Sequence, residues 1–264
     1  MKFDFSTPMT TYELIAMVIS VLALVLPIIR WIYDTYIKRL RIDFLPSGMI
    51  TLFHNKSGSY LSFGGVYEAK NKPTTIKSMS AKVIRKADNA TLPLTWSIFP
   101  SPVFRDVGGK YESSFETAHP FKVDADTLAP AFIEFRNAQH NMDEVSESIL
   151  LPVVNASSPV LYQQNATLPA VDQGVKALRE YSHAKLALND YFFWKPGEYE
   201  IVLETSHSKG FFGKSFYITL TSEESAKLRE NIDSMLVIHV AEHFRVNLPF
   251  NTVRKSFDSQ GVIK

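Results

Sequence analysis

The segment that most constrains this chain runs from residue 14 to residue 29 and carries no charge. A helix rises about 1.5 Å per residue, so this segment reaches roughly 24 Å, and extension to residues 12–33 gives roughly 33 Å, the thickness of a bilayer's hydrocarbon core. Apolar side chains lie on every face of such a helix, whereas a surface helix of a soluble protein is apolar along one stripe. We therefore expect a single transmembrane helix over residues 12–33, preceded by an N-terminal tail of residues 1–11.

The residues that flank this segment indicate that it is not cleaved off as a signal peptide, and they predict its orientation in the membrane. Asp4 and Glu13 precede the apolar run and no small-residue cleavage site follows it, so a cleavable signal peptide fits poorly. Basic residues gather on the C-terminal side, which should therefore stay in the cytoplasm. We expect the N-terminus outside, the C-terminal domain in the cytoplasm, and a basic juxtamembrane segment, residues 34–41, at the lipid headgroups. The candidate headgroup contacts are Arg30, Lys38, Arg39 and Arg41.

Two further observations bear on the compartment. Four N-x-S/T sequences would be glycan acceptors only if the domain entered a secretory pathway. They begin at Asn55, Asn89, Asn155 and Asn165. The chain has no cysteine, so disulfides give no information about the compartment. Display of the same domain outside the cytoplasm is therefore the alternative orientation.

Charge and composition limit the partners. With 28 basic and 27 acidic residues the net charge is +1, so no global field attracts nucleic acid and we expect no nucleic-acid partner. The hydrophobic content of 45%, with 19 Phe, supplies a packed core for one large domain. Ala16 and Ser20 form a small-xxx-small pair in the apolar segment, which is compatible with a homo-oligomer as well as an unknown protein partner.

Beyond the anchor the hydrophobic pattern has mostly period two, which predicts strands. Clusters of Asn, Gly, Pro and Ser separate these segments and favour turns. The expected strands are 49–53, 60–69, 76–85, 94–99 and 131–135. Their spacing predicts a mainly β domain over residues 42–221, built as an antiparallel sandwich.

Two short pieces resemble immunoglobulin-like and fibronectin-like domains. In residues 67–77, YEAKNKPTTIK, a strand ends in Asn-x-Pro and the next begins with Ile. Residues 194–203, WKPGEYEIVL, are similar to the penultimate strand of such domains. The resemblance implies an immunoglobulin-like antiparallel sandwich and identifies no family.

Outside the strand patterns, residues 146–234 are predicted to form loop and helix. Residues 146–169 contain three prolines among Asn and Ser and predict a long loop, whereas 171–188 have a helical period and predict a helix inserted in the sandwich. Thr221 and Glu224 form a capping-box sequence for a helix that runs to about Ser234 and begins the C-terminal segment, 222–264. Periodicity does not decide between helix and strand for residues 235–246.

The sharpest enzymatic motif is His239-Val240-Ala241-Glu242-His243, which resembles the H-x-x-E-H spacing of inverted zinc proteases. On a helix this spacing places two imidazoles one turn apart with a carboxylate beside them, so His239, Glu242 and His243 are candidate zinc ligands and base. That family takes a further ligand well downstream, and Asp258 is the one acidic residue that follows His243. Surface histidines are the competing interpretation.

A second motif, residues 208–215, ends in Gly-Lys-Ser but lacks the first glycine of a phosphate-binding loop and is followed by a strand pattern. We expect a β-hairpin with Phe211 and Phe212 near its tip, between Lys209 and Lys214. This composition suits a partner groove or a membrane interface, unless the Phe rings fold back onto the core.

These observations favour a membrane-anchored, non-catalytic binding or assembly module at the cytoplasmic face, without a cofactor. The alternatives are a membrane-bound zinc hydrolase that uses His239, Glu242 and His243, or the same binding domain outside the cytoplasm.

Overall fold

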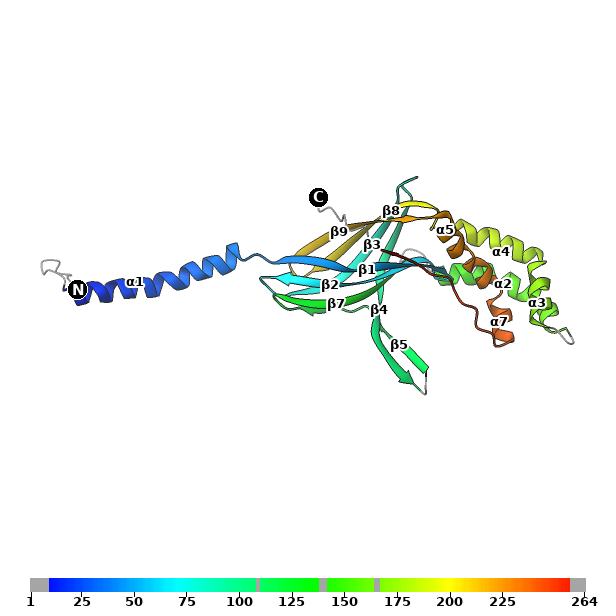
Figure 1. Ribbon diagram of the computed structural model, residues 1–264, viewed down its shortest axis with the longest axis horizontal. Helices are drawn as coiled ribbons and strands as arrows, with labels where there is room; N and C mark the ends of the chain where they lie inside the picture. The colour runs from blue at the N-terminus through cyan, green and yellow to red at the C-terminus, as the bar shows by residue number, and fades with distance from the viewer. Residues whose placement is uncertain (1–9, 108–109, 138–141, 164–166, 257–264) are drawn as a thin grey trace.

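The computed structural model describes residues 10–107, 110–137, 142–163 and 167–256. Helix α1 (Thr11–Ile32) begins at a capping box in which Thr10 and Glu13 bond to each other's backbone N–H, and it continues into the π-helical turn η1 (Tyr33–Ile37). A helix is expected over residues 12–33, and the bounds of α1 agree with it to one residue. Residues 11–36 form one helical stretch long and apolar enough to cross a membrane, and α1 projects away from the rest of the chain (Figure 1).

In the described part of the chain, ten strands form one antiparallel sheet. Its order is β10-β1-β2-β7-β4-β3-β8-β9, with β5 beside β4 and β6 beside β3. The strands are β1 (Arg41–Asn55), β2 (Gly58–Lys70), β3 (Thr74–Arg85), β4 (Thr91–Val107), β5 (Lys110–Thr117), β6 (Phe121–Val123), β7 (Thr127–Arg136), β8 (Gly197–His207), β9 (Gly210–Leu220) and β10 (Val253–Ser256). All five strand segments expected from period-two patterning lie within these strands.

The sheet is a nearly closed barrel, and the expected immunoglobulin-like sandwich is not confirmed. Strand β4 pairs with β3 near its start and with β7 further on, which joins the two halves of the sheet into one continuous surface. The barrel then closes where β9 approaches the first half of β1. At this seam Nζ of Lys214 donates to Asp43 Oδ1 and to the carbonyl oxygen of Phe44, each at 2.7 Å.

Aromatic rings fill the barrel interior. Phe44 lies within 6.3 Å, centroid to centroid, of the rings of Phe63, Tyr67 and Phe216, and Phe63 stacks on Phe135. All five side chains are at most 4% exposed. Burial of such rings is a main source of folding free energy, so this cluster is the centre of the domain.

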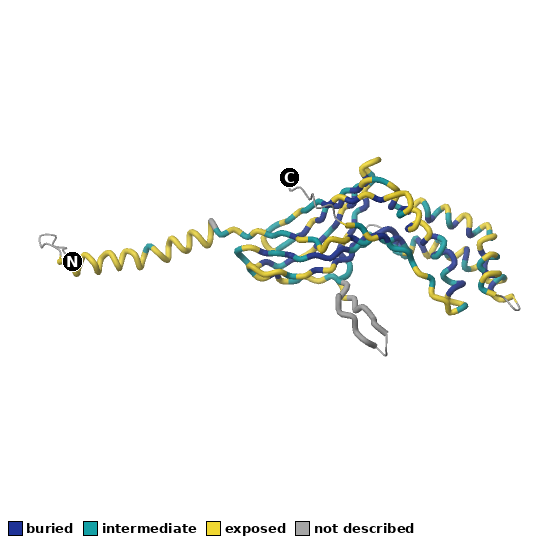
Figure 2. The backbone as a smooth tube through the Cα atoms, in the orientation of Figure 1, coloured by how far each residue is buried: buried dark blue, intermediate teal, exposed yellow. Residues whose placement is uncertain are grey.

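Six helices cap one end of the barrel, three between β7 and β8 and three between β9 and β10. They are α2 (Met142–Leu161), α3 (Leu168–Lys176), α4 (Arg179–Asp190), α5 (Ser222–Arg229), α6 (Asn231–Leu236) and α7 (Ile238–His243) in the described residues. They gather at the end opposite α1 (Figure 1). Figure 2 shows buried and exposed residues interspersed along these helices, whereas α1 is exposed over nearly its whole length.

The helices correct three expectations. Residues 146–169, expected as a loop, are largely helix, because α2 runs from Met142 to Leu161 with Pro152 and Pro159 inside it. The single helix expected over 171–188 is two, α3 and α4, which meet at Ala177 and Leu178. The capping box at Thr221 is confirmed, but its helix ends at Arg229 and the chain continues in the short helices α6 and α7.

Buried polar contacts attach this helical cap to the barrel. Nε1 of the fully buried Trp194 donates to the carbonyl oxygen of Phe53 at the end of β1 (2.7 Å), and Ser225 Oγ donates to the carbonyl oxygen of Trp194 (2.6 Å). Asn231, also fully buried, donates from Nδ2 to the carbonyl oxygen of His54 (2.9 Å). Because buried polar groups need partners, these bonds fix the cap on the barrel end.

Candidate functional site

Strand register gathers several chain segments at the barrel end next to α1. Arg41, the first residue of β1, pairs with Lys70, the last residue of β2. Strand β7 begins at the same end, because its first residue, Thr127, pairs with Ala69. Strand β3 begins beside β6, and β8 ends beside the start of β3. We call this the anchor-side end: the linker 38–40, the turns 71–73, 124–126 and 208–209, and the strand residues that flank them (Figure 1).

The linker between the anchor and the barrel is short and held in place. Only residues 38–40 separate η1 from β1, a length that spans about 10 Å when fully extended. Asn71 Nδ2 donates to the carbonyl oxygen of Arg39 (2.8 Å), and the Asn71 backbone N–H donates to Asp126 Oδ1 (3.1 Å). Asn71 has a φ of 73°, a left-handed conformation that asparagine tolerates better than most residues. Asn71, which lies in the turn 71–73, therefore joins the linker to this turn and to the turn 124–126.

The hairpin between β8 and β9 divides the four loop residues singled out in the sequence. Its turn contains the exposed Lys209, and Phe211, in β9, is 85% exposed. Phe212 is half-buried and packs against the hydrophobic core. Lys214 lies further along β9 at the seam with Asp43, so the structure brings Lys209 and Phe211 together at the turn and places Lys214 elsewhere.

The anchor-side end is basic. Two of its carboxylates are paired, Glu68 with Lys70 (3.2 Å) and Asp124 with Lys122 (2.6 Å). No ion pair involves Lys72 or Lys209 among the described residues. This end contains seven basic residues and three acidic ones. The basic residues are Lys38, Arg39, Arg41, Lys70, Lys72, Lys122 and Lys209, and the acidic ones are Glu68, Asp124 and Asp126. Of the headgroup contacts expected from sequence, Lys38, Arg39 and Arg41 lie here, and Arg30 lies in α1, 3.8 Å from Asp34.

A groove of about 410 Å³ lies in the helical cap, between α3, α6, α7 and the chain after α7. Its polar edge includes Asp172, paired with Lys176 at 2.7 Å, and Asp233, which accepts a hydrogen bond from the Tyr181 hydroxyl at 2.5 Å. Its apolar walls are Leu168, Pro169, Val237, Val240, Val246 and Leu248. Sequence reasoning did not find this groove, because its walls come from segments more than 60 residues apart.

The candidate zinc residues lie on α7, which gives His239 and His243 the helical spacing that the motif requires. Nε2 of His239 is 2.7 Å from Ser157 Oγ on α2, and the ring of His243 packs edge-on against Tyr162 with centroids 5.5 Å apart. Burial lowers the pKa of His239, while Glu242 acts in the opposite direction. Among the described residues no group of three His, Cys, Asp or Glu side chains is placed to hold a metal. The contacts shown for both imidazoles are helix-packing contacts.

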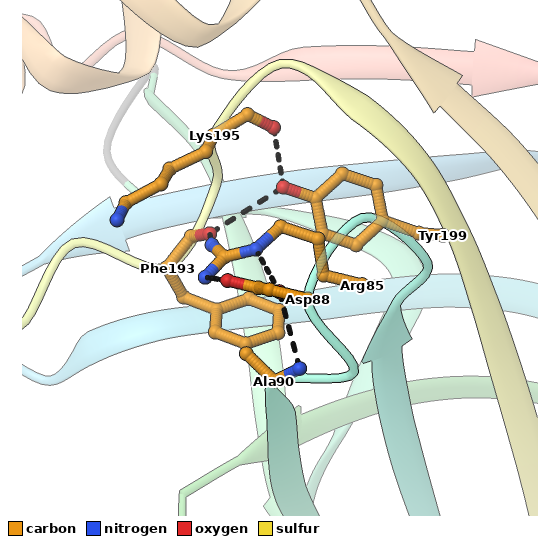
Figure 3. Close-up of polar contacts among 6 residues, drawn as sticks. All are labelled: Arg85, Asp88, Ala90, Phe193, Lys195 and Tyr199. Carbon is orange, nitrogen blue, oxygen red and sulfur yellow. Dashed lines mark hydrogen bonds and ion pairs between the residues drawn. The ribbon is translucent and has the colours of Figure 1, made fainter.

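A buried arginine organises the barrel end beside the cap (Figure 3). Arg85 donates from Nε and Nη2 to the two carboxylate oxygens of Asp88 (2.8 and 2.7 Å) and from Nη1 to the carbonyl oxygen of Phe193 (2.7 Å). The Tyr199 hydroxyl donates to the carbonyl oxygen of Lys195. The Arg85 guanidinium lowers the pKa of Asp88 to about 2. This cluster fixes the segment that carries Trp194 and offers no free group for chemistry.

The N-x-S/T asparagines have different environments. Asn55 is half-buried, and its amide donates to the Tyr60 hydroxyl (3.0 Å). Asn89 is exposed in the β3–β4 turn and Asn155 is exposed on α2. Asn165 lies outside the described residues.

Comparisons with known proteins do not place the chain in a family. No family model matches it, and no curated protein matches its sequence. A similar solved structure is a family 123 glycoside hydrolase from Clostridium perfringens, studied for the details of glycolipid glycan hydrolysis. The match has 12% sequence identity and a TM-score of 0.25, and covers 64% of this chain and 22% of that one. At this TM-score the likeness carries no argument about fold or activity.

Proposed function

We propose that this protein is a single-pass membrane protein that presents its barrel and helical cap at the cytoplasmic face as a non-catalytic binding or assembly module. The observation that carries this proposal is α1, in which no residue is buried against the rest of the chain. Leu22, Leu24 and Ile29 on this helix are each at least 50% exposed. Exposed apolar surface of this extent is costly in water and favourable in lipid, so a bilayer is the environment that suits α1.

The rest of the domain supports binding at its outer surfaces. Aromatic side chains occupy the barrel interior, so a partner would meet an outer surface, such as the cap groove or the turns of the anchor-side end. Tethering confines the domain to a thin layer at the membrane, which raises its effective concentration toward partners in the same membrane. Partners in the same membrane can then bind the domain even where the interface is weak.

Protease protection of a C-terminal epitope tag tests the orientation. In sealed, right-side-out cells the tag should survive added protease and should be digested once the membrane is opened, because the basic flank of α1 favours the cytoplasmic side. A tag on the N-terminus should be digested in both conditions and serves as the control. Digestion of the C-terminal tag in sealed cells would contradict the cytoplasmic placement and would turn attention to Asn89 and Asn155 as glycan acceptors.

The zinc content of the purified protein distinguishes the zinc-hydrolase alternative from the non-catalytic proposal. The purified protein should contain no stoichiometric zinc if His239 serves to pack α7 against α2, and the His239→Ala variant should then differ from the wild type in stability alone. Bound zinc that is lost in His239→Ala would contradict the non-catalytic proposal. His183→Ala, at an exposed histidine on α4, is the matched control.

A further inference from the structure

The short linker sets the distance between the barrel and any membrane that holds α1. Three residues join η1 to β1, so the anchor-side end lies within about 10 Å of the point where the helical stretch ends. Asn71 holds the linker backbone at Arg39, which limits swinging of the barrel about the linker. Whichever side of the membrane carries the domain, its anchor-side end must therefore face the headgroups of the bilayer.

The charges at this end match an anionic lipid surface. Lys72 and Lys209 make no ion pair among the described residues, and Arg41 begins β1 next to the linker. Each Lys or Arg near an anionic membrane surface contributes favourably, and the contribution fades within a Debye length of about 8–10 Å. The linker length keeps the anchor-side end inside that range. Since the whole chain carries a net charge of only +1, the positive charge at this end is a local feature.

Phe211 adds an apolar contact at the same end. Its ring is 85% exposed, and one residue, Gly210, separates it from the turn that carries Lys209. An exposed Phe beside Lys is the composition of interfacial membrane contacts, in which the ring enters the boundary between headgroups and acyl chains while the ammonium stays at the phosphates. The neighbouring Phe212 packs on the core and keeps the hairpin attached to the barrel.

We infer that the anchor-side end docks on the bilayer that holds α1, with Lys72 and Lys209 on anionic headgroup phosphates and Phe211 inserted at the interface. The inference rests on the proposed membrane span of α1 and adds a second, reversible contact with the lipid. Docking fixes the long direction of the domain along the membrane normal and points the helical cap, with its groove, away from the lipid.

Site-directed labelling of the full chain tests this docking. The protein has no cysteine, so a single introduced cysteine carries the only thiol label. The three label sites are Leu22→Cys in α1, Phe211→Cys at the anchor-side end and Leu186→Cys on α4 in the cap, where the native side chain is 68% exposed. Each variant is reconstituted into vesicles of equal parts phosphatidylcholine and phosphatidylglycerol, labelled with an aromatic fluorophore, and exposed to quenchers attached to lipid acyl chains.

We expect quenching at positions 22 and 211 and none at 186. Quenching at 22 without quenching at 211 would overturn docking while leaving the membrane span intact. Absence of quenching at 22 would overturn the span and docking together, so the two failures are distinguishable.

Charge reversal identifies the lipid chemistry. In the Phe211→Cys background, Lys72→Glu combined with Lys209→Glu should lower the ratio of docked to undocked protein by at least about tenfold. The matched control is Arg179→Glu, at an exposed residue in the cap, which should leave the ratio unchanged. Vesicles of phosphatidylcholine alone should reproduce the loss. A docked fraction that is insensitive both to the two reversals and to the anionic lipid would overturn the assignment of headgroup phosphate as the ligand.

Discussion

At the level of single residues, the buried histidine His54 should make the stability of the domain depend on pH. His54 is 2% exposed, Nδ1 lies 2.9 Å from Ser59 Oγ, and its ring packs edge-on against Phe192. Burial lowers the pKa of His54 to about 4 from an ordinary value of 6.5. Between these values the unfolded chain binds a proton that the folded chain excludes, so stability falls as the pH falls through this range, by up to about 3 kcal/mol.

Chemical denaturation at a series of pH values measures this dependence. The His54→Phe variant keeps a ring of similar shape but cannot titrate, so the slope of its unfolding free energy against pH should be smaller than that of the wild type. His183→Ala, at an exposed position, is the control for removal of a surface imidazole. Burial also lowers the pKa of His207 and His239, which leaves a residual slope of the same sign in the His54 variant. Equal slopes in wild type and His54→Phe would refute the assignment.

The orientation of Phe211 and Phe212 could be predicted in part from the alternation of apolar and polar residues along β9. Leu220, Ile218 and Phe216 alternate with polar residues, and continuation of this period turns Phe212 inward and Phe211 outward. The position of Lys214 could not be predicted in this way, because its partner Asp43 lies 171 residues away. Local patterns give the face of a side chain, whereas a contact across the barrel seam requires the strand order.

At the level of elements, two adjacent glycines in β2 allow aromatic rings to pack directly on both faces of this strand. A Cβ on Gly65 would lie 2.2 Å from Cζ of Phe44 and 2.7 Å from the carbonyl oxygen of Leu45. On the opposite, outer face of β2, a Cβ on Gly64 would lie 2.9 Å from the ring of Phe132, which is 39% exposed. The rings therefore pack directly against the β2 backbone, a use of glycine that is typical of strongly curved sheets.

The Gly65→Ala variant should be destabilised by about 3 kcal/mol, because neither the buried Phe44 ring nor the β1 backbone has room to move away. Thermal or chemical unfolding measures the loss. Gly213→Ala is the matched control in another strand of the same barrel, since its new methyl would meet only the Leu203 carbonyl oxygen at 3.9 Å and should change stability by less than about 1 kcal/mol. Equal stabilities of the two variants would show that the core tolerates the extra methyl.

The helices show where local sequence rules fail. Pro152 and Pro159 made residues 146–169 read as a loop, yet α2 places both prolines on its exposed side. Its buried residues are Met142, Ser146, Val153, Ser157 and Leu161, spaced by four or seven, a stripe that packs on the rest of the cap and on the turn between β1 and β2. Two of the five are serines, so hydrophobicity alone concealed the period. The Thr221 capping box was predictable because it is a contact within four residues.

At the level of the whole molecule, the sequence predicted the N-terminal apolar helix and the β-rich class but not the barrel. Strand positions follow from period-two patterning, whereas the order of the strands depends on long-range pairs such as Trp96 with Phe135. The same limit applies to the candidate site. Lys209 and Phe211 were found from a local hairpin, while Asn71 and Lys72 read only as turn residues until register brought them to the same end of the barrel.

The anchor and the domain should be energetically separate parts of one chain. Among the described residues α1 has no buried side chain, and the barrel core is complete without it. A chain that begins at Lys38 should therefore keep the thermal midpoint of the full chain within roughly 2 °C in the same detergent buffer, which corresponds to less than about 1 kcal/mol. Because removal of α1 takes away the exposed apolar surface, the shortened chain should also remain in the aqueous phase when a detergent solution is warmed to phase separation, whereas the full chain enters the detergent phase.

Trp194→Ala in the full chain is the contrasting variant for this measurement. Trp194 is fully buried, its indole donates to Phe53 at the barrel end, and its own carbonyl accepts from Ser225 in the cap. Loss of a buried Trp costs about 3–5 kcal/mol, so the midpoint should fall by on the order of 10 °C while partition into detergent is unchanged. A shortened chain that unfolds as early as this variant would mean that α1 supports the barrel. A midpoint equal to that of the full chain would mean that α1 adds nothing to the stability of the barrel, as expected if its proposed place is the bilayer.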